Sequence, residues 1–138
     1  MLRYDPLTPE QRSERMSRVR AADTKPEMLV RRMAHALGFR YRLHVKTLPG
    51  CPDLVFSSRR KVIFVHGCFW HQHGCGRYRM PRTRKRFWNK KLKTNVQRDA
   101  ENYNQLAGAG WEVLVVWECE VADPVRLVGT LTSFLRCV

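Results

Sequence analysis

The side chains most able to do chemistry begin with an acid and a histidine at the ends of neighbouring candidate strands. Asp53 follows Pro52 at the start of one strand, and His66 closes the next. If these strands pair, the Asp53 carboxylate and a backbone carbonyl near Val65 can hold Mg²⁺, which prefers oxygen ligands. Such an ion polarises a scissile phosphate and lowers the pKa of a bound water, while a neutral histidine moves the proton. The pattern therefore predicts phosphodiester hydrolysis.

A second acid lies on a candidate helix further along the chain. Asp99 borders an apolar stripe that continues at Tyr103 and Ala107. A carboxylate there can accept a proton from one ring nitrogen of a histidine and so fix the tautomer of the other nitrogen. Taken singly, an Asp after Pro is usually a turn residue, a His at a strand end is usually structural, and a helix Asp is usually solvated. Their joint presence favours a functional site.

Thiols and imidazoles form a third set with the spacing of a metal centre. Thiolate and imidazole ligands suit Zn²⁺, and a closed tetrahedral shell is structural because it leaves no position for chemistry. His71 competes for the same ion, but two ligands so close would crowd in a loop, so we assign His73 and leave His71 free. The alternative is a set of buried cysteines without metal. The expected zinc ligands are Cys68, His73, Cys75 and Cys119.

The charge of the chain indicates a polyanionic partner. The 138 residues carry 26 Lys and Arg against 12 Asp and Glu, a formal net charge of +14. Ten basic and no acidic residues lie between Arg77 and Arg98, a density that would repel itself without an anion opposite. A solvated face or ribosomal-type RNA binding are the alternatives. No apolar run approaches a membrane span and no signal-peptide core is present, so we expect a cytoplasmic protein with reduced thiols.

The elements that must position these residues follow from capping and periodicity. Thr8 and Pro9 begin a helix with few apolar residues, and Thr24 with Glu27 forms a capping-box signature for a second helix that ends at Gly38. We expect one domain of α/β class with helices on both faces of the sheet. After the helices we predict three antiparallel strands at 40–45, 53–57 and 61–65, helices at 83–93 and 94–107, a buried strand at 111–117 and a helix at 123–135.

Three motifs resemble those of the very short patch repair DNA mismatch endonucleases, over nearly the whole chain from about Arg12. They are Leu48-Pro49-Gly50-x-Pro52-Asp53, His66-Gly67-Cys68-Phe69-Trp70-His71 and Trp117-Glu118-Cys119. The resemblance implies a restriction-endonuclease-like fold with a mixed central sheet, a structural zinc and catalytic Mg²⁺. It implies a DNA-contacting arm at 1–22 and an endonuclease domain at 23–138. The implied reaction nicks duplex DNA on the 5′ side of the T in a T·G mismatch.

The same resemblance implies roles for single residues. Asp53 and the Val65 carbonyl would bind Mg²⁺, His71 oriented by Asp99 would act as the base, and His66 would contact the phosphate or assist proton transfer. Apolar side chains inserted into a poorly stacked mismatch turn weak pairing into selectivity, although Phe69 and Trp70 could instead pack on the zinc loop. The remaining positions are Glu27 and Asn95, which would line the site, the wedge residues Met16, Phe69 and Trp70, and the DNA contacts Arg84 and Lys85.

Two positions depart from the family pattern. Cys51 stands where a basic residue is usual, and Val65 replaces a hydroxyl residue without affecting a carbonyl ligand. The alternative functions are an endonuclease of different mismatch or sequence specificity, and a non-catalytic zinc-containing module that binds nucleic acid. For the partner we expect double-stranded DNA with a mismatch, with mismatch-repair proteins as further candidates and no membrane. We expect a monomer, because one mismatch has no two-fold symmetry.

Overall fold

A mixed four-stranded sheet forms the centre of the computed structural model, which describes residues 24–68 and 83–136. The strand order is β1-β2-β3-β4; β1 to β3 are antiparallel neighbours, and β4 lies parallel to β3. This arrangement confirms the predicted α/β class and the antiparallel pairing of the first three strands. The strands are β1 (Arg42–Leu43), β2 (Leu54–Phe56), β3 (Lys61–His66) and β4 (Glu112–Trp117), and a short 3-10 turn, η1 (Ser57–Arg59), joins β2 to β3.

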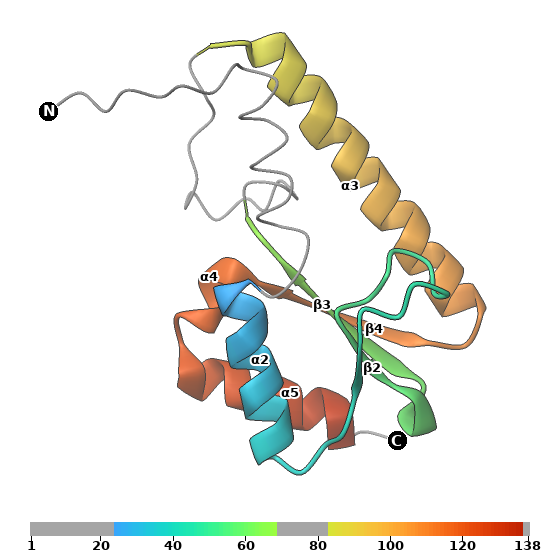
Figure 1. Cartoon of the computed structure of the whole chain (residues 1–138), viewed down its shortest axis with the longest axis vertical. Helices are drawn as coiled ribbons and strands as arrows, with labels where there is room; N and C mark the ends of the chain where they lie inside the picture. The colour runs from blue at the N-terminus through green and yellow to red at the C-terminus, as the bar shows by residue number, and fades with distance from the viewer. Residues whose placement is uncertain (1–23, 69–82, 137–138) are drawn as a thin grey trace, which may run out of the picture.

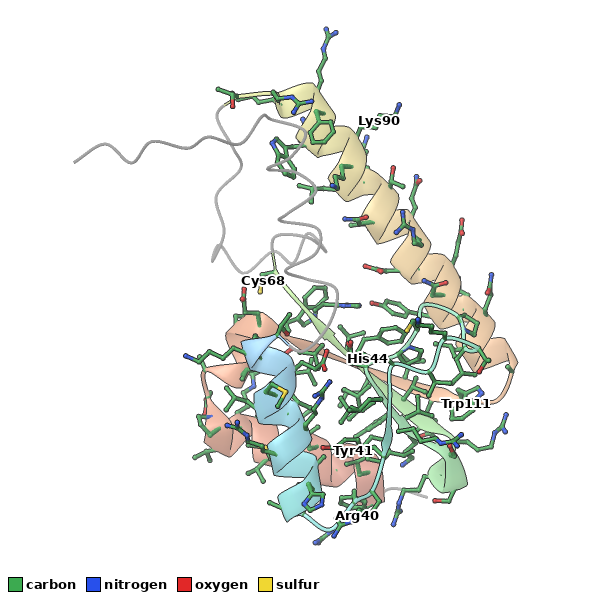
Figure 2. All side chains as sticks on the ribbon, in the orientation of Figure 1. Arg40, Tyr41, His44, Cys68, Lys90 and Trp111 are labelled. Carbon is green, nitrogen blue, oxygen red and sulfur yellow. The ribbon has the colours of Figure 1, made fainter. Side chains whose placement is uncertain are left out.

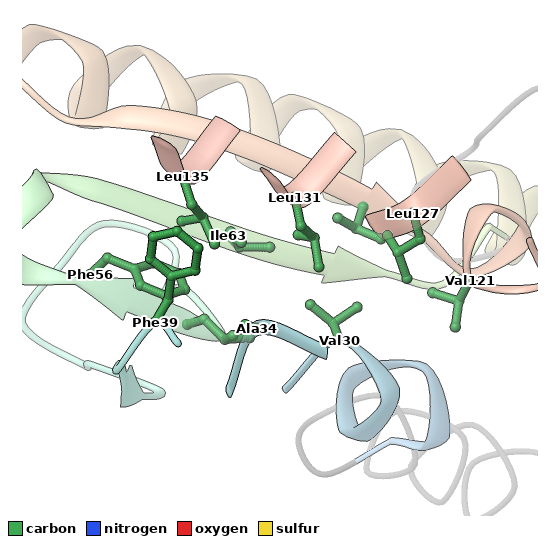
Figure 3. Packing of buried hydrophobic residues seen from close by; sticks show 11 residues of the cluster. Val30, Ala34, Phe39, Phe56, Ile63, Val121, Leu127, Leu131 and Leu135 are labelled. Carbon is green, nitrogen blue, oxygen red and sulfur yellow. The ribbon is translucent and has the colours of Figure 1, made fainter. Parts of the chain in front are cut away.

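Helices cover both faces of the sheet, as predicted (Figure 1). One face packs against α2 (Lys25–Ala36) and α5 (Pro124–Arg136), and the other against the long α3 (Lys85–Gly108). Alternate residues of a strand point to opposite faces, so Leu54 and Phe56 join the first core whereas Val55 joins the second. Figure 3 shows the first core, in which α5 contributes Leu127, Leu131 and Leu135.

Helix α2 begins and ends where its sequence predicts. The Thr24 hydroxyl accepts a hydrogen bond from the Glu27 amide at 3.4 Å, and Gly38 adopts a positive φ of 94° just past the helix. A glycine tolerates this backbone conformation without steric cost. The cap matters for the site, because it places Glu27 in the first helical turn, where the residue is buried.

The two helices predicted at 83–93 and 94–107 are wrong, since α3 is one continuous helix. Thr94 does not cap a helix; its hydroxyl donates to the Lys90 carbonyl one turn earlier, at 2.9 Å. A threonine hydroxyl can bond within a helix as well as at its start, and no glycine or proline interrupts 85–107. No helix in the described part of the chain is long and apolar enough to cross a membrane.

The last strand is less buried than predicted. In β4 only Val116 is fully buried, and Glu112 is exposed. The reason is its position, because β4 is the edge of the sheet opposite β1. The chain then turns into α4 (Glu118–Val121), a one-turn helix that the sequence did not predict. The predicted helix near 10–20 lies outside the described residues.

The core on the α5 face should carry much of the stability. Leu131 is fully buried in this core, so we expect Leu131→Ala to lower the free energy of unfolding by about 2 to 5 kcal/mol through lost burial and the cavity left behind. Urea denaturation followed by circular dichroism measures the change. Val125 on the same helix is 81% exposed, and Val125→Ala should alter stability by less than about 0.5 kcal/mol. Equal effects of the two substitutions would contradict this packing.

Candidate active site

The end of β3 and the start of β2 meet at the candidate site, and Asp53 links them. Because β2 and β3 are antiparallel, Asp53 at the entry to β2 lies near the exit of β3. Its Oδ2 accepts a hydrogen bond from the Val65 amide at 2.7 Å. Pro52 is buried just before it. The carboxylate that the sequence singled out is therefore fixed against the backbone of the strand that carries His66.

A second carboxylate approaches from α2. Glu27 is buried and bonds to Arg31, one helical turn later. On its other side, both carboxylate oxygens lie 3.0 to 3.1 Å from Nε2 of His44. The same Nε2 is 3.7 Å from Oδ1 of Asp53. His44 thus stands between two carboxylates that come from elements distant in sequence.

Sequence reasoning missed His44, and the strand register explains how it reaches the site. Arg42 and Leu43 pair with Val55 and Leu54, so the next residue, His44, falls opposite Asp53. Its amide donates to the Asp53 carbonyl at 3.2 Å. The residue also has a left-handed backbone with φ of 46°, uncommon outside glycine. Only the exact pairing of 42–43 with 54–55 could have identified it, and the sequence predicts the strands without their register.

Burial and a neighbouring carboxylate together raise the pKa of Asp53. Burial raises the pKa of this carboxyl to about 7, and the neighbouring Glu27 carboxylate adds to the rise. The hydrogen bond from Val65 and the charge of His44 act in the opposite direction. A buried carboxylate pair of this kind is stabilised by a cation that binds both members.

The donor set fits a divalent metal ion. One ligand atom from each of Glu27, His44 and Asp53 lies within 4.8 Å of the others. Carboxylate oxygens are the ligands of hard cations such as Mg²⁺ and Mn²⁺. An ion held here would lie beside the end of β3, where the Val65 amide already bonds to Asp53. The arrangement can therefore hold a Lewis acid next to a bound anionic substrate.

His66 lies on the α3 side of the sheet and contacts that helix. Its Nε2 is 2.6 Å from the Tyr103 hydroxyl, and its ring is 7% exposed and packs near Trp117. Burial raises the pKa of Tyr103, with the charges of Asp99 and Asp53 adding to the rise. Tyr103 is therefore a neutral phenol at physiological pH. Asp99, one helical turn before Tyr103, is half-buried on the same side of α3.

Two of the four predicted zinc ligands are described, and both follow the parallel pair of strands. His66 at the end of β3 pairs in register with Trp117 at the end of β4. Cys68 and Cys119 each come two residues later, so the parallel register brings them to the same end of the sheet. Cys68 is buried and Cys119 half-buried, and neither forms a disulfide. Figure 2 shows Cys68 at the end of β3.

The other predicted residues divide between α3 and segments that are not described. Arg84 and Lys85 are exposed at the start of α3, where the Arg84 guanidinium lies 4.3 Å from the Phe87 ring centroid. Asn95 is 3% exposed on the buried face of this helix. Figure 2 shows Lys90 on the outer part of α3, far from His44. Outside the described residues lie Met16, Phe69, Trp70, His71, His73 and Cys75.

Comparison with known proteins adds a consistent set of relatives. The family model described as DNA mismatch endonuclease Vsr matches residues 4–77. A type II nicking enzyme of Xanthomonas oryzae pv. oryzae is 48% identical over 132 residues, 96% of this chain and 94% of that protein. A type II nicking enzyme of Neisseria meningitidis is 42% identical over the same shares. DNA mismatch endonuclease Vsr of Escherichia coli K12 is 42% identical over 116 residues, 84% of this chain and 74% of that protein.

Proposed function

Since this chain belongs to the Vsr family of DNA mismatch endonucleases, we propose that it nicks one strand of duplex DNA at a T·G mismatch. The phosphodiester on the 5′ side of the mismatched T is hydrolysed, which starts very short patch repair. The observation that carries this proposal is the Asp53 carboxylate, hydrogen-bonded to Val65 and 3.7 Å from His44. A non-catalytic binding module would have no use for it.

Mg²⁺ is the proposed catalytic cation, with the Asp53 carboxylate and the Val65 carbonyl as its protein ligands and Glu27 beside them. When bound, this ion polarises the scissile phosphate and activates a water. His71, oriented by Asp99, removes the proton from the attacking water, and His66 contacts the phosphate or assists proton transfer. Two observations support these separate roles of the two histidines. The Tyr103 hydroxyl holds His66, and Asp99 lies one helical turn before Tyr103 on α3.

Tyr103→Phe tests the positioning of His66. The substitution removes the hydroxyl 2.6 Å from Nε2 and leaves the ring packed on Phe64. One such hydrogen bond contributes about 1 kcal/mol, so we expect nicking to slow roughly fivefold to tenfold. Single-turnover cleavage of a labelled duplex measures this rate. An unchanged rate would mean that His66 needs no support from α3.

Structural Zn²⁺ is proposed at Cys68, His73, Cys75 and Cys119. The support is the parallel register of β3 and β4, which brings two of these thiols to one end of the sheet. A bound zinc would tie the chain after β3 to the chain after β4, and in small zinc proteins this contributes directly to folding. It has no role in the chemical step, because four protein ligands close its shell.

DNA binding is proposed to use the basic start of α3 and the wedge residues. Arg84 and Lys85 contact phosphates, Asn95 lines the site, and the arm at 1–22 adds contacts to the endonuclease domain at 23–138. Met16, Phe69 and Trp70 insert into the base stack at the mismatch. The exposed cations at the start of α3 support the phosphate contacts, since backbone binding depends on Lys and Arg.

We further propose a cytoplasmic monomer that works with mismatch-repair proteins. A single mismatch presents no two-fold axis for a symmetric dimer to match. One chain then both recognises the mismatch and cuts the strand. Sedimentation of the protein on a mismatched duplex would give the stoichiometry directly.

One gel tests the proposed reaction. The protein and Mg²⁺ are incubated with end-labelled duplexes that differ only in carrying a T·G or a T·A pair. We expect one cut, in the T strand, 5′ of the T, and only in the T·G duplex. Cutting of both strands or of another mismatch would favour an endonuclease of different specificity. Binding without any cutting, under all divalent ions tried, would favour the non-catalytic module.

A further inference from the structure

His44 has no role in the proposed mechanism, yet its ring nitrogen lies between the two carboxylates of the site. Building on the proposed metal at Asp53, we propose that His44 is a nitrogen ligand of that ion, so that the site, while it accepts Mg²⁺, binds Mn²⁺ and Co²⁺ more tightly than an all-oxygen site would.

The distances are close to the edges of an octahedron. Ligands about 2.1 Å from an octahedral ion lie about 3 Å apart when they are neighbours. Nε2 of His44 is 3.0 and 3.1 Å from the two Glu27 oxygens and 3.7 Å from Oδ1 of Asp53. The nitrogen and Glu27 therefore stand at the spacing of neighbouring ligands, and Asp53 would join them by moving less than about 1 Å.

The hairpin of β1 and β2 holds His44 in this place. Its amide donates to the Asp53 carbonyl, and its left-handed backbone turns the chain immediately after β1. The side chain of His44 is 23% exposed, against 3% for Glu27 and 15% for Asp53. The imidazole is thus the most accessible of the three groups.

The charge and the donor atoms of the ligands decide which cation binds more tightly. Glu27 and Asp53 supply two negative charges, and the Arg31 guanidinium on Glu27 offsets one of them. A neutral imidazole adds a donor without adding charge. Mg²⁺ prefers oxygen donors, whereas affinity for imidazole rises from Mn²⁺ to Co²⁺ along the first transition row. Replacing His44 by an oxygen donor should therefore weaken Mn²⁺ and Co²⁺ binding and leave Mg²⁺ binding nearly unchanged.

The test uses the full chain with Mn²⁺ as the probe. Electron spin-echo modulation of bound Mn²⁺ detects a directly coordinated ¹⁴N, and replacing the histidine nitrogens by ¹⁵N shifts that signal in the unmodified protein. We expect the signal in the wild type and its loss in His44→Gln. We also expect the Mn²⁺ dissociation constant to rise about 10-fold or more in His44→Gln, with less than a threefold change for Mg²⁺. His35→Gln, on the exposed end of α2, is the matched control and should behave as the wild type.

The outcomes separate this inference from the proposed function. If Asp53→Asn still binds Mn²⁺ at wild-type affinity, the metal site at Asp53 is wrong. If Asp53→Asn loses Mn²⁺ but the wild type shows no nitrogen signal, or His44→Gln keeps it, only the role of His44 is wrong. A far-UV circular dichroism spectrum and a melting curve of His44→Gln that match those of the wild type exclude a folding defect as the cause of a lost signal.

Discussion

Asp53→Asn should abolish nicking and at the same time make the metal-free protein more stable at pH 8. Asparagine keeps an oxygen that can accept the hydrogen bond from Val65 but removes the charge that binds the cation. Loss of a metal's charge stabilisation is worth several kcal/mol, so the rate should fall about 1,000-fold or more. Single-turnover cleavage of the T·G duplex measures this loss.

The gain in stability follows from the pKa of Asp53. Burial raises this pKa from 3.8 to about 7 in the folded protein. The native state therefore favours the protonated carboxyl; its contribution to stability is full below about pH 4 and is lost as the pH rises through about 7. The uncharged amide of Asp53→Asn does not titrate and would not suffer this loss. We expect the free energy of unfolding at pH 8 to rise by roughly 2 to 4 kcal/mol, and by nearly nothing at pH 4.

Urea denaturation in a chelator at the two pH values gives both numbers. Asp123→Asn is the matched control, because Asp123 is an exposed residue whose Oδ1 accepts from the Arg126 amide at the start of α5. Asparagine caps a helix as well as aspartate does, so nicking and stability should stay unchanged. A variant at Asp53 that is inactive but less stable at pH 8 would contradict the destabilising burial of this charge beside Glu27.

Cys119→Ser should remove zinc from the protein and much of its stability. The thiol is one of four proposed ligands, and serine is a far weaker ligand for this ion. Because metal binding and folding are coupled in such sites, we expect zinc to fall from one equivalent to nearly none. The free energy of unfolding should fall by several kcal/mol. Elemental analysis of the purified protein and a urea curve measure the two effects.

Cys51→Ser provides the comparison within the same chain. Cys51 precedes Pro52 and β2, so it lies on the side of β3 opposite β4, and it is not one of the proposed ligands. Its replacement should leave one zinc per chain. Full zinc content in Cys119→Ser, or equal zinc loss from both variants, would count against the ligand set.

Local signals predicted much of the fold. The cap at Thr24, the turn at Gly38 and the alternation in β2 and β3 are each encoded within a few residues, and these elements appear where expected. Two predictions, the helix start at Thr94 and the burial of β4, were wrong because they depend on more distant parts of the chain. Thr94 could cap or bond within a helix, and the uninterrupted sequence of α3 decides for the latter. The exposure of β4 depends on its place at the sheet edge, which its apolar composition does not reveal.

The site shows the same division between local and distant information. Pairing of β2 with β3 brings Asp53 to Val65, as the sequence suggested. Glu27 was associated with the site through family resemblance, and the structure places it 3.0 Å from His44. His44 itself was missed, because its position depends on the register of a two-residue strand and on a left-handed turn after it. A histidine in a predicted strand does not by itself indicate that it reaches the site.

The length of α3 sets how an attached duplex would be held. Its 24 residues form a rod of about 36 Å, close to one turn of B-DNA. The inner end packs on the sheet through Leu106. The outer half extends away from the sheet (Figure 1) and carries most of the cations of the helix. Residues 85–98 alone extend about 21 Å, or some six base pairs. With the phosphate contacts proposed for this half of α3, and with the helix running along the duplex, the footprint on DNA would be asymmetric and reach several base pairs further on one flank of the cut than on the other.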